Sequence, residues 1–166
     1  RGEKLAPRDA GVLALKHSLL LAQERSRLEK RMGEAEKATA EGNHAEALRL
    51  YREIETRDPG FPELRTSIAS ALFESKKYAE SLVYYRAEDD RGRGFYPALG
   101  VLYCLHHLGR SREALALLPA TQARFPGLEE GRDLVKLQVQ ALRALGDLRG
   151  ASEVLRARVE SDPKEA

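Results

Sequence analysis

Apolar residues recur at helical spacing in four separate stretches of the chain. In each stretch they return every three or four residues, as Leu64, Ile68 and Leu72 do, so that one face of a helix carries them. The four stretches are 28–41, 62–75, 95–108 and 132–145. Each is followed by a turn and a second apolar segment of similar length. No period-two alternation and no long β-branched run indicates a strand. The pattern predicts an all-α fold built from pairs of helices.

A short motif recurs at the turn inside each pair. A Gly precedes an Ala by five residues, and a Pro follows that Ala by twelve. The copies are Gly42, Ala47 and Pro59; Gly109, Ala114 and Pro126; and Gly146, Ala151 and Pro163. A weaker copy between the first two has Lys76 at the Gly position and Ser81 at the Ala position. The turns are then 34, 33 and 37 residues apart. Such a period indicates repeated supersecondary units, each of which needs its neighbours to bury its apolar face.

Each position of the motif has a physical role in a helical hairpin. Gly can adopt a positive φ and end the first helix sharply. A small residue lets the two helices approach where they cross, and a bulky one four residues later fills the space where they diverge. The bulky residues are Tyr51, Tyr85, Leu118 and Leu155. Pro ends the second helix because it disfavours the helical conformation of the residue before it.

These residues resemble the tetratricopeptide repeat family. In the 34-position frame of that family, counted from Leu28, position 15 holds Gly42, Lys76, Gly109 and Gly146, and position 20 holds Ala47, Ser81, Ala114 and Ala151. Position 8 holds Ala35, Ala69, Leu102 and Val139, and position 32 holds Pro59, Arg93, Pro126 and Pro163. The aromatic residue of position 4 is absent, since Arg31, Arg65, Ala98 and Val135 stand there. The resemblance implies a right-handed α-solenoid of antiparallel helix pairs. Its organisation would be a leader at 1–27, repeats at 28–61, 62–94, 95–131 and 132–163, and a tail at 164–166.

The resemblance also implies a binding groove, because the first helices of successive repeats line a concave surface in that family. Carried over position by position, the groove residues are Met32, Glu36, Thr39, Thr66, Ser70, Phe73, Leu99, Tyr103, His106, Lys136, Gln140 and Arg143. An apolar and aromatic middle with a basic end suits a peptide or helix that has an apolar anchor and an acidic group. The carboxylate clamp of the family needs Lys and Asn at positions that here hold Met32 and Glu36, then Thr66 and Ser70, so that clamp is not expected. The convex face and the chain ends remain alternative interaction surfaces.

Charge and hydropathy exclude several classes of partner. Lys plus Arg number 28 and Asp plus Glu number 26, so a net charge of +2 gives no basis for binding nucleic acid. The most apolar stretch, 12–22, is interrupted by Lys16, His17 and Ser18 and is too short to cross a membrane. It does not have the form of a signal peptide. We expect a cytoplasmic protein, or a periplasmic one if the absence of Met at the first position reflects removal of an upstream targeting sequence.

No motif for catalysis, a cofactor or a metal stands out. Cys104, His106 and His107 are close in sequence, but adjacent helical residues point about 100° apart and cannot converge on one ion. We expect Cys104 to be a buried small apolar residue. The sequence therefore predicts no enzyme activity, no cofactor and no metal.

The two ends of the chain carry apolar residues that the predicted repeats would not fully bury. From about Asp9 nothing stops a helix until Gly42, and this helix either caps the first repeat, with a break near 23–27 as one option, or overhangs and pairs with another chain. Near the other end, Leu148, Val154, Leu155 and Val159 are expected to be partly exposed, since no polar capping helix follows the last repeat. Self-association through either end is therefore one expectation.

The sequence favours a non-enzymatic scaffold or adaptor that binds a peptide or helix of a partner protein, as part of a larger bacterial protein or complex. A small secretion-type chaperone that holds an amphipathic segment is the alternative. An RNA-binding repeat protein would need a basic stripe along the inner helices, which Glu36, Thr66 and Leu99 do not supply.

Overall fold

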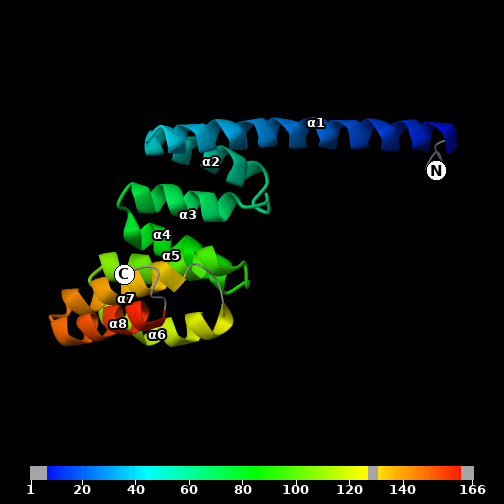
Figure 1. Ribbon diagram of the computed structural model, residues 1–166. Coiled ribbons are helices and arrows are strands. Elements are labelled where there is room, and N and C mark those ends of the chain that lie inside the picture. Colours follow the sequence, from blue (N-terminus) through cyan, green and yellow to red (C-terminus); the bar gives the residue numbers. More distant parts are fainter. Residues whose placement is uncertain (1–6, 127–130, 162–166) are drawn as a thin grey trace. The chain divides into compact units, whose positions relative to one another are not determined.

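The computed structural model describes residues 7–126 and 131–161, and within them α-helices are joined by turns and loops, with no strand (Figure 1). Its helices are α1 (Pro7–Ala40), α2 (His44–Arg57), α3 (Leu64–Glu74), α4 (Tyr78–Asp89), α5 (Phe95–His107), α6 (Ser111–Arg124), α7 (Gly131–Ala144) and α8 (Leu148–Ser161). The all-α prediction is confirmed. The chain divides into two compact units, of which the first ends at Leu64 and the second begins at Arg65. Each unit is described by itself.

The four predicted turns share one hydrogen-bonded geometry. Gly42, Lys76, Gly109 and Gly146 all have a positive φ, between 60° and 79°. In each turn the amide of this residue bonds the carbonyl three residues back, and the next amide bonds the carbonyl five residues earlier. Gly109 thus donates to His106 at 3.0 Å and Arg110 to Leu105 at 2.9 Å. This Schellman arrangement satisfies carbonyls that the end of a helix would otherwise leave without partners. Lys76 adopts it in spite of its Cβ.

The small residues of the motif are buried where the helices cross. Ala47, Ser81 and Ala114 are completely buried, and Ala151 almost so. Ser81 fits at an Ala position because its hydroxyl donates to the carbonyl of Ala69 at 2.7 Å, so no polar atom is left unpaired. Of the bulky residues four positions later, Tyr51, Tyr85 and Leu118 are buried, whereas Leu155 is half exposed.

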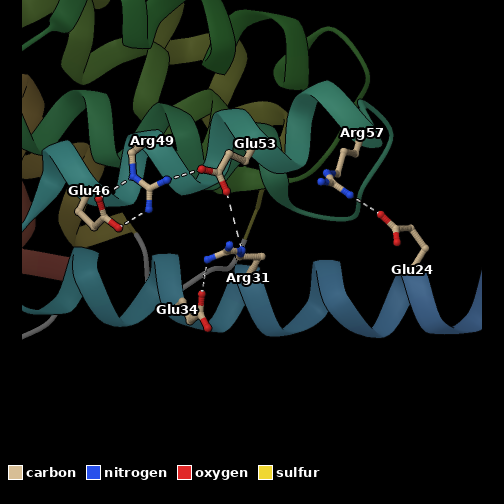
Figure 2. A network of polar contacts seen from close by, with 7 residues as sticks. All are labelled: Glu24, Arg31, Glu34, Glu46, Arg49, Glu53 and Arg57. Carbon is tan, nitrogen blue, oxygen red and sulfur yellow. Dashed lines mark hydrogen bonds and ion pairs between the residues drawn. The ribbon is translucent and has the colours of Figure 1, made fainter.

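The first unit joins α1 to α2 through a small core and a polar border. Leu28, Met32 and Ala35 of α1 are buried, as are Tyr51 and Ile54 of α2. Figure 2 shows the charged residues along the border of the two helices. They are Glu24, Arg31 and Glu34 on α1, and Glu46, Arg49, Glu53 and Arg57 on α2. Ion pairs join the helices, among them Arg57 to Glu24 at 2.5 Å and Arg31 to Glu53 at 3.8 Å.

The N-terminal half of α1 overhangs the rest of its unit. The helix is continuous over 34 residues, so the break considered near 23–27 does not occur. In Figure 1 it extends well past the end of α2. Its apolar side chains before Leu28 are more than half exposed: Val12, Leu13, Leu15, Leu19, Leu20 and Leu21. Among the described residues no helix is both long enough and apolar enough to cross a bilayer.

The second unit has a larger core, to which every helix from α3 to α7 contributes. Its buried residues include Ala69, Leu82, Leu102, Ala114 and Leu137. Cys104 lies at its centre, where its thiol donates to the Ser81 hydroxyl at 3.4 Å, and burial raises the pKa of that thiol. The expectation of a buried Cys104 is confirmed.

The outer face of α8 is exposed, as expected from the sequence. Leu148, Leu155 and Val159 are 68%, 50% and 45% exposed. The tail at 164–166 and Pro163 lie outside the described residues.

Candidate functional site

Nine of the twelve predicted groove residues line two adjoining hollows in the second unit. The smaller hollow has a volume of about 250 Å³, and its lining consists of Thr66, Ser70, Phe73, Tyr85, Tyr96, Leu99, Gly100 and Tyr103. The larger has a volume of about 540 Å³, and its lining consists of Phe73, Tyr103, His106, His107, Lys136, Gln140, Arg143 and Ala144. Phe73 and Tyr103 belong to both. We call the two hollows together the groove.

Helical spacing explains why these residues meet. On α5, Leu99, Tyr103 and His106 are separated by four and three residues, which places them on one face. On α7, Lys136, Gln140 and Arg143 have the same spacing. Because α5 packs against α7, the two faces lie side by side. The third wall comes from α3, through Thr66, Ser70 and Phe73.

The floor between the hollows is an aromatic cluster centred on Phe73. Its ring meets Tyr78, His107 and Tyr103 edge-on, at centroid distances of 5.2, 5.3 and 6.4 Å. Tyr78 stacks on His107 at 4.5 Å with an interplanar angle of 10°. Edge-on and stacked pairs of this kind fix ring positions as well as burying area. The cluster gives the groove a preformed apolar centre.

Tyr103 connects the aromatic floor to α7. Its hydroxyl donates to the carbonyl of Asp133 at 3.4 Å, a long hydrogen bond. Burial, and then the nearby Asp133 charge, raise the pKa of Tyr103, so it stays neutral at physiological pH. Its ring is partly exposed and is available for contact with a ligand.

The larger hollow has a positive rim. Lys136 and Arg143 are exposed, and within the part of the chain that the structure describes neither forms an ion pair. No Asp or Glu is among the residues that line this hollow. A negative group that entered it would therefore meet two cations without displacing a protein carboxylate.

His106 lies at the inner edge of the same hollow. Its Nδ1 is 3.0 Å from the Ser111 hydroxyl on α6. Burial, followed by the charge of His107, lowers the pKa of His106. The other ring nitrogen, Nε2, has no hydrogen-bond partner among the described residues. Ser111 therefore orients the ring through Nδ1, and no other described residue engages Nε2.

Three predicted groove residues lie in the first unit, and one of them is buried. Met32 is only 7% exposed and belongs to the core between α1 and α2, while Glu36 is exposed on α1. Leu99 of the second unit is likewise only 8% exposed, so it supports the floor of the smaller hollow rather than offering a large surface. Thr39, also expected in the groove, donates to the carbonyl of Ala35 at 3.0 Å and lies 3.3 Å from the Tyr51 hydroxyl.

Sequence reasoning missed several residues of the groove: Tyr85, Tyr96, Gly100, His107 and Ala144. One signal was present. A Cβ on Gly100 would lie 2.6 Å from the Tyr85 ring, so a Gly inside an apolar helix marked a close approach by a large neighbour. The others depend on how α3, α5 and α7 pack together.

A third hollow, of about 420 Å³, lies between α1 and α2 in the first unit. Its lining is mostly charged: Arg27, Leu28, Lys30, Arg31, Glu34, Glu53, Ile54 and Arg57. Here Arg27, Arg31 and Arg57 already have carboxylate partners at 2.5 to 3.8 Å. These contacts join α1 to α2, and the hollow is a weaker candidate for a ligand.

The described residues bring together no metal-binding cluster and no exposed cysteine thiol. Within residues 7–126 and 131–161, no group of three or more His, Cys, Asp or Glu side chains is arranged to hold a metal. Cys104 is enclosed by the core and its thiol has a raised pKa, both of which oppose reactivity. His106 and His107 line the same hollow, whose lining contains no carboxylate, and the Ser111 hydroxyl that contacts His106 is buried.

The chain matches no protein-family model, and a comparison with curated proteins finds no match either.

Proposed function

We propose that this chain is a protein-interaction module whose groove binds a segment of a partner protein, and that it performs no catalysis of its own. The observation that carries the proposal is the aromatic floor formed by Phe73 and Tyr103, which is shared by two hollows and open to solvent on one side. Partly exposed rings held by their neighbours are typical anchors at protein interfaces, because they offer contact area without further loss of side-chain freedom.

The dimensions and chemistry of the groove support a peptide ligand. The smaller hollow, at about 250 Å³, has room for one large apolar side chain, and its walls are mostly aromatic and aliphatic. The adjoining larger hollow extends the surface along α5 and α7. A segment with one apolar anchor and several flanking residues would contact both.

The helical hairpins and their shared turn also support membership of the tetratricopeptide repeat family as part of this proposal. Four pairs with the same Schellman turn and a small residue at each crossing suit such repeats. The right-handed solenoid and the use of the module as a scaffold or adaptor in a larger protein belong to the same proposal.

Selection of short peptides from a random displayed library tests the proposal. We expect the purified chain to select peptides with a shared aromatic or large aliphatic residue. A variant that carries both Phe73→Ala and Tyr103→Ala should bind the selected peptides about 30-fold or more weakly, since anchor residues at interfaces contribute about 2 kcal/mol or more.

The matched control is Tyr96→Ala, which removes a ring that is 68% exposed at the margin of the smaller hollow and should weaken binding much less. Circular dichroism must show that the double variant remains helical. If the library yields no peptide, or if the folded double variant binds as the wild type does, the proposed function is wrong.

A further inference from the structure

The larger hollow combines cations, imidazoles and an aromatic floor in a way that specifies one chemical feature of the ligand. Lys136 and Arg143 have the spacing of one helical face and have no ion pair within the described chain. His106 lies across from them on α5, with Nε2 unpartnered and Nδ1 at Ser111. We propose that this hollow is a subsite for an acidic side chain of the bound peptide, and that binding of the carboxylate is coupled to protonation of His106.

This inference rests on the proposed function, because it concerns the ligand of the same groove. It goes further by assigning the peptide both a charge and an orientation. The apolar anchor occupies the smaller hollow beside α3, and the Glu or Asp lies toward α7. The Phe73 and Tyr103 rings separate the two positions.

Charge complementarity identifies the occupant of the subsite. In the first unit, the Arg side chains between α1 and α2 are matched by Glu24, Glu34 and Glu53 of the same unit. The larger hollow of the second unit has cations on its rim and no acidic residue in its lining. A ligand carboxylate would supply the missing partner and would accept charge-assisted hydrogen bonds from Lys136 and Arg143.

The surroundings of His106 explain why its proton is coupled to the ligand. The titratable or charged groups around it are His107 and Tyr103 on α5, and Lys136 and Arg143 on α7. The other packed elements contribute uncharged groups: Phe73 from α3, Tyr78 from α4 through its stack on His107, and Ser111 from α6. Burial, and then the charge of His107, lower the pKa of free His106, and none of these groups offsets that effect with an opposite charge.

The direction of the coupling follows from linkage. A carboxylate beside His106 favours the charged ring, so the pKa of His106 is higher in the complex than in the free protein. Binding then takes up a proton, and affinity is greatest at a pH below the pKa of the free ring. The extra affinity is lost as pH rises through the pKa of the complex. Each unit by which the ligand raises the pKa makes binding about tenfold tighter at the acidic limit.

Paired synthetic peptides test the inference. Each peptide carries one Phe or Leu anchor and one Glu at a different spacing from it, and its counterpart has Gln in place of Glu. Dissociation constants are measured by fluorescence anisotropy about one pH unit below and about one unit above the ordinary His pKa of about 6.5. For the best spacing we expect the Glu peptide to bind about tenfold more tightly than its Gln counterpart, with a larger ratio at the lower pH.

Single variants separate the contributions of the cations and the imidazole. Lys136→Gln and Arg143→Gln should each reduce the preference for Glu over Gln and leave the affinity for the Gln peptide unchanged. His106→Gln should remove the pH dependence of that preference. The matched controls are Arg112→Gln, which removes an exposed cation from α6 outside the groove, and His17→Gln, which removes an imidazole from α1. Neither should change the preference or its pH dependence.

An NMR titration of the His rings gives an independent readout. The chain has four His residues, and of these the structure places only His106 and His107 in the larger hollow. Addition of the Glu peptide should raise the pKa of His106, and addition of the Gln peptide should not. If both peptides bind equally at both pH values and the pKa of His106 does not move, the acidic subsite is wrong while the peptide-binding groove stands. If neither peptide binds, the proposed function fails as well.

Discussion

The two units use the same helical hairpin but treat charge in opposite ways. Between α1 and α2, Arg31 and Arg57 contact carboxylates from the facing helix (Figure 2). Of the described charged residues that line the hollow there, all but Lys30 form ion pairs. Between α5 and α7, Lys136 and Arg143 border a hollow with no acidic lining residue. The repeated frame is common to both, since each contains the same turn and the same buried small residue. The residues at the variable positions therefore decide whether the cations beside the space between two helices are paired mostly within the protein or left without a carboxylate.

The largest effect on stability should come from substituting Gly100 on α5 of the second unit, and the comparison is with Gly33 on α1 of the first. Gly100→Ala would place a Cβ 2.6 Å from the buried ring of Tyr85, whose pKa is raised to about 12, chiefly by burial. We expect a loss of about 1–3 kcal/mol in the free energy of unfolding, as for other overpacked sites. The measurement is urea unfolding followed by circular dichroism.

Gly33→Ala on α1 is the matched control. Nothing lies within 4 Å of a Cβ at that position, so the better helix propensity of Ala should stabilise the protein by about 1 kcal/mol. Equal stabilisation by both substitutions would show that the Tyr85 ring moves freely, and the tight packing beneath the groove would be refuted.

A smaller effect is expected at the turns that the two units share. Lys76 has a φ of 60°, which costs energy for a residue with a Cβ, so Lys76→Gly should stabilise the second unit by about 0.5–1 kcal/mol. The reverse change in the first unit, Gly42→Lys, should destabilise by a similar amount. Thermal and urea unfolding of both variants provide the check. If Lys76→Gly destabilises the protein, the Lys side chain contributes more stability than its positive φ costs.

The smallest effect on stability should come from removing single charged side chains. Arg57→Gln removes a cation that pairs with Glu24 at 2.5 Å and should cost up to about 1 kcal/mol at low salt, less as the salt concentration rises. Arg143→Gln removes a cation without a partner among the described residues and should leave stability unchanged. Unfolding curves measured at several salt concentrations provide the check. If Arg143→Gln lowers the free energy of unfolding more than Arg57→Gln does, the comparison is wrong.

The local features of the fold could be predicted because they depend on nearby residues. The turns at Gly42, Gly109 and Gly146 follow from backbone freedom at a single position, and even Lys76 was located through its place in the repeat. The first helix of each later pair lies within two residues of its predicted bounds. The position of Ala47 and Ala114 in the repeated motif also indicated that they would be buried where two helices cross. The stacking of all four pairs into one solenoid stays a prediction.

The site was predicted less completely because burial and lining depend on packing between helices distant in sequence. The frame placed both Met32 and Tyr103 in a groove, but Met32 is buried between α1 and α2 while Tyr103 is partly exposed. His107 follows a predicted groove residue and enters the larger hollow through its stack on Tyr78, 29 residues earlier. The ion pair of Arg57 with Glu24 likewise joins residues 33 positions apart. No local pattern specifies such contacts.

NMR mapping of a bound peptide tests the central claim most directly. With a peptide from the displayed library, the resonances that change most should belong to α3, α5 and α7, including Phe73, Tyr103 and Gln140. Those of the charged border of α1 and α2 should stay in place, because its Arg side chains already have partners. Changes concentrated on α1, α2 or the exposed face of α8, with the groove unchanged, would contradict the account.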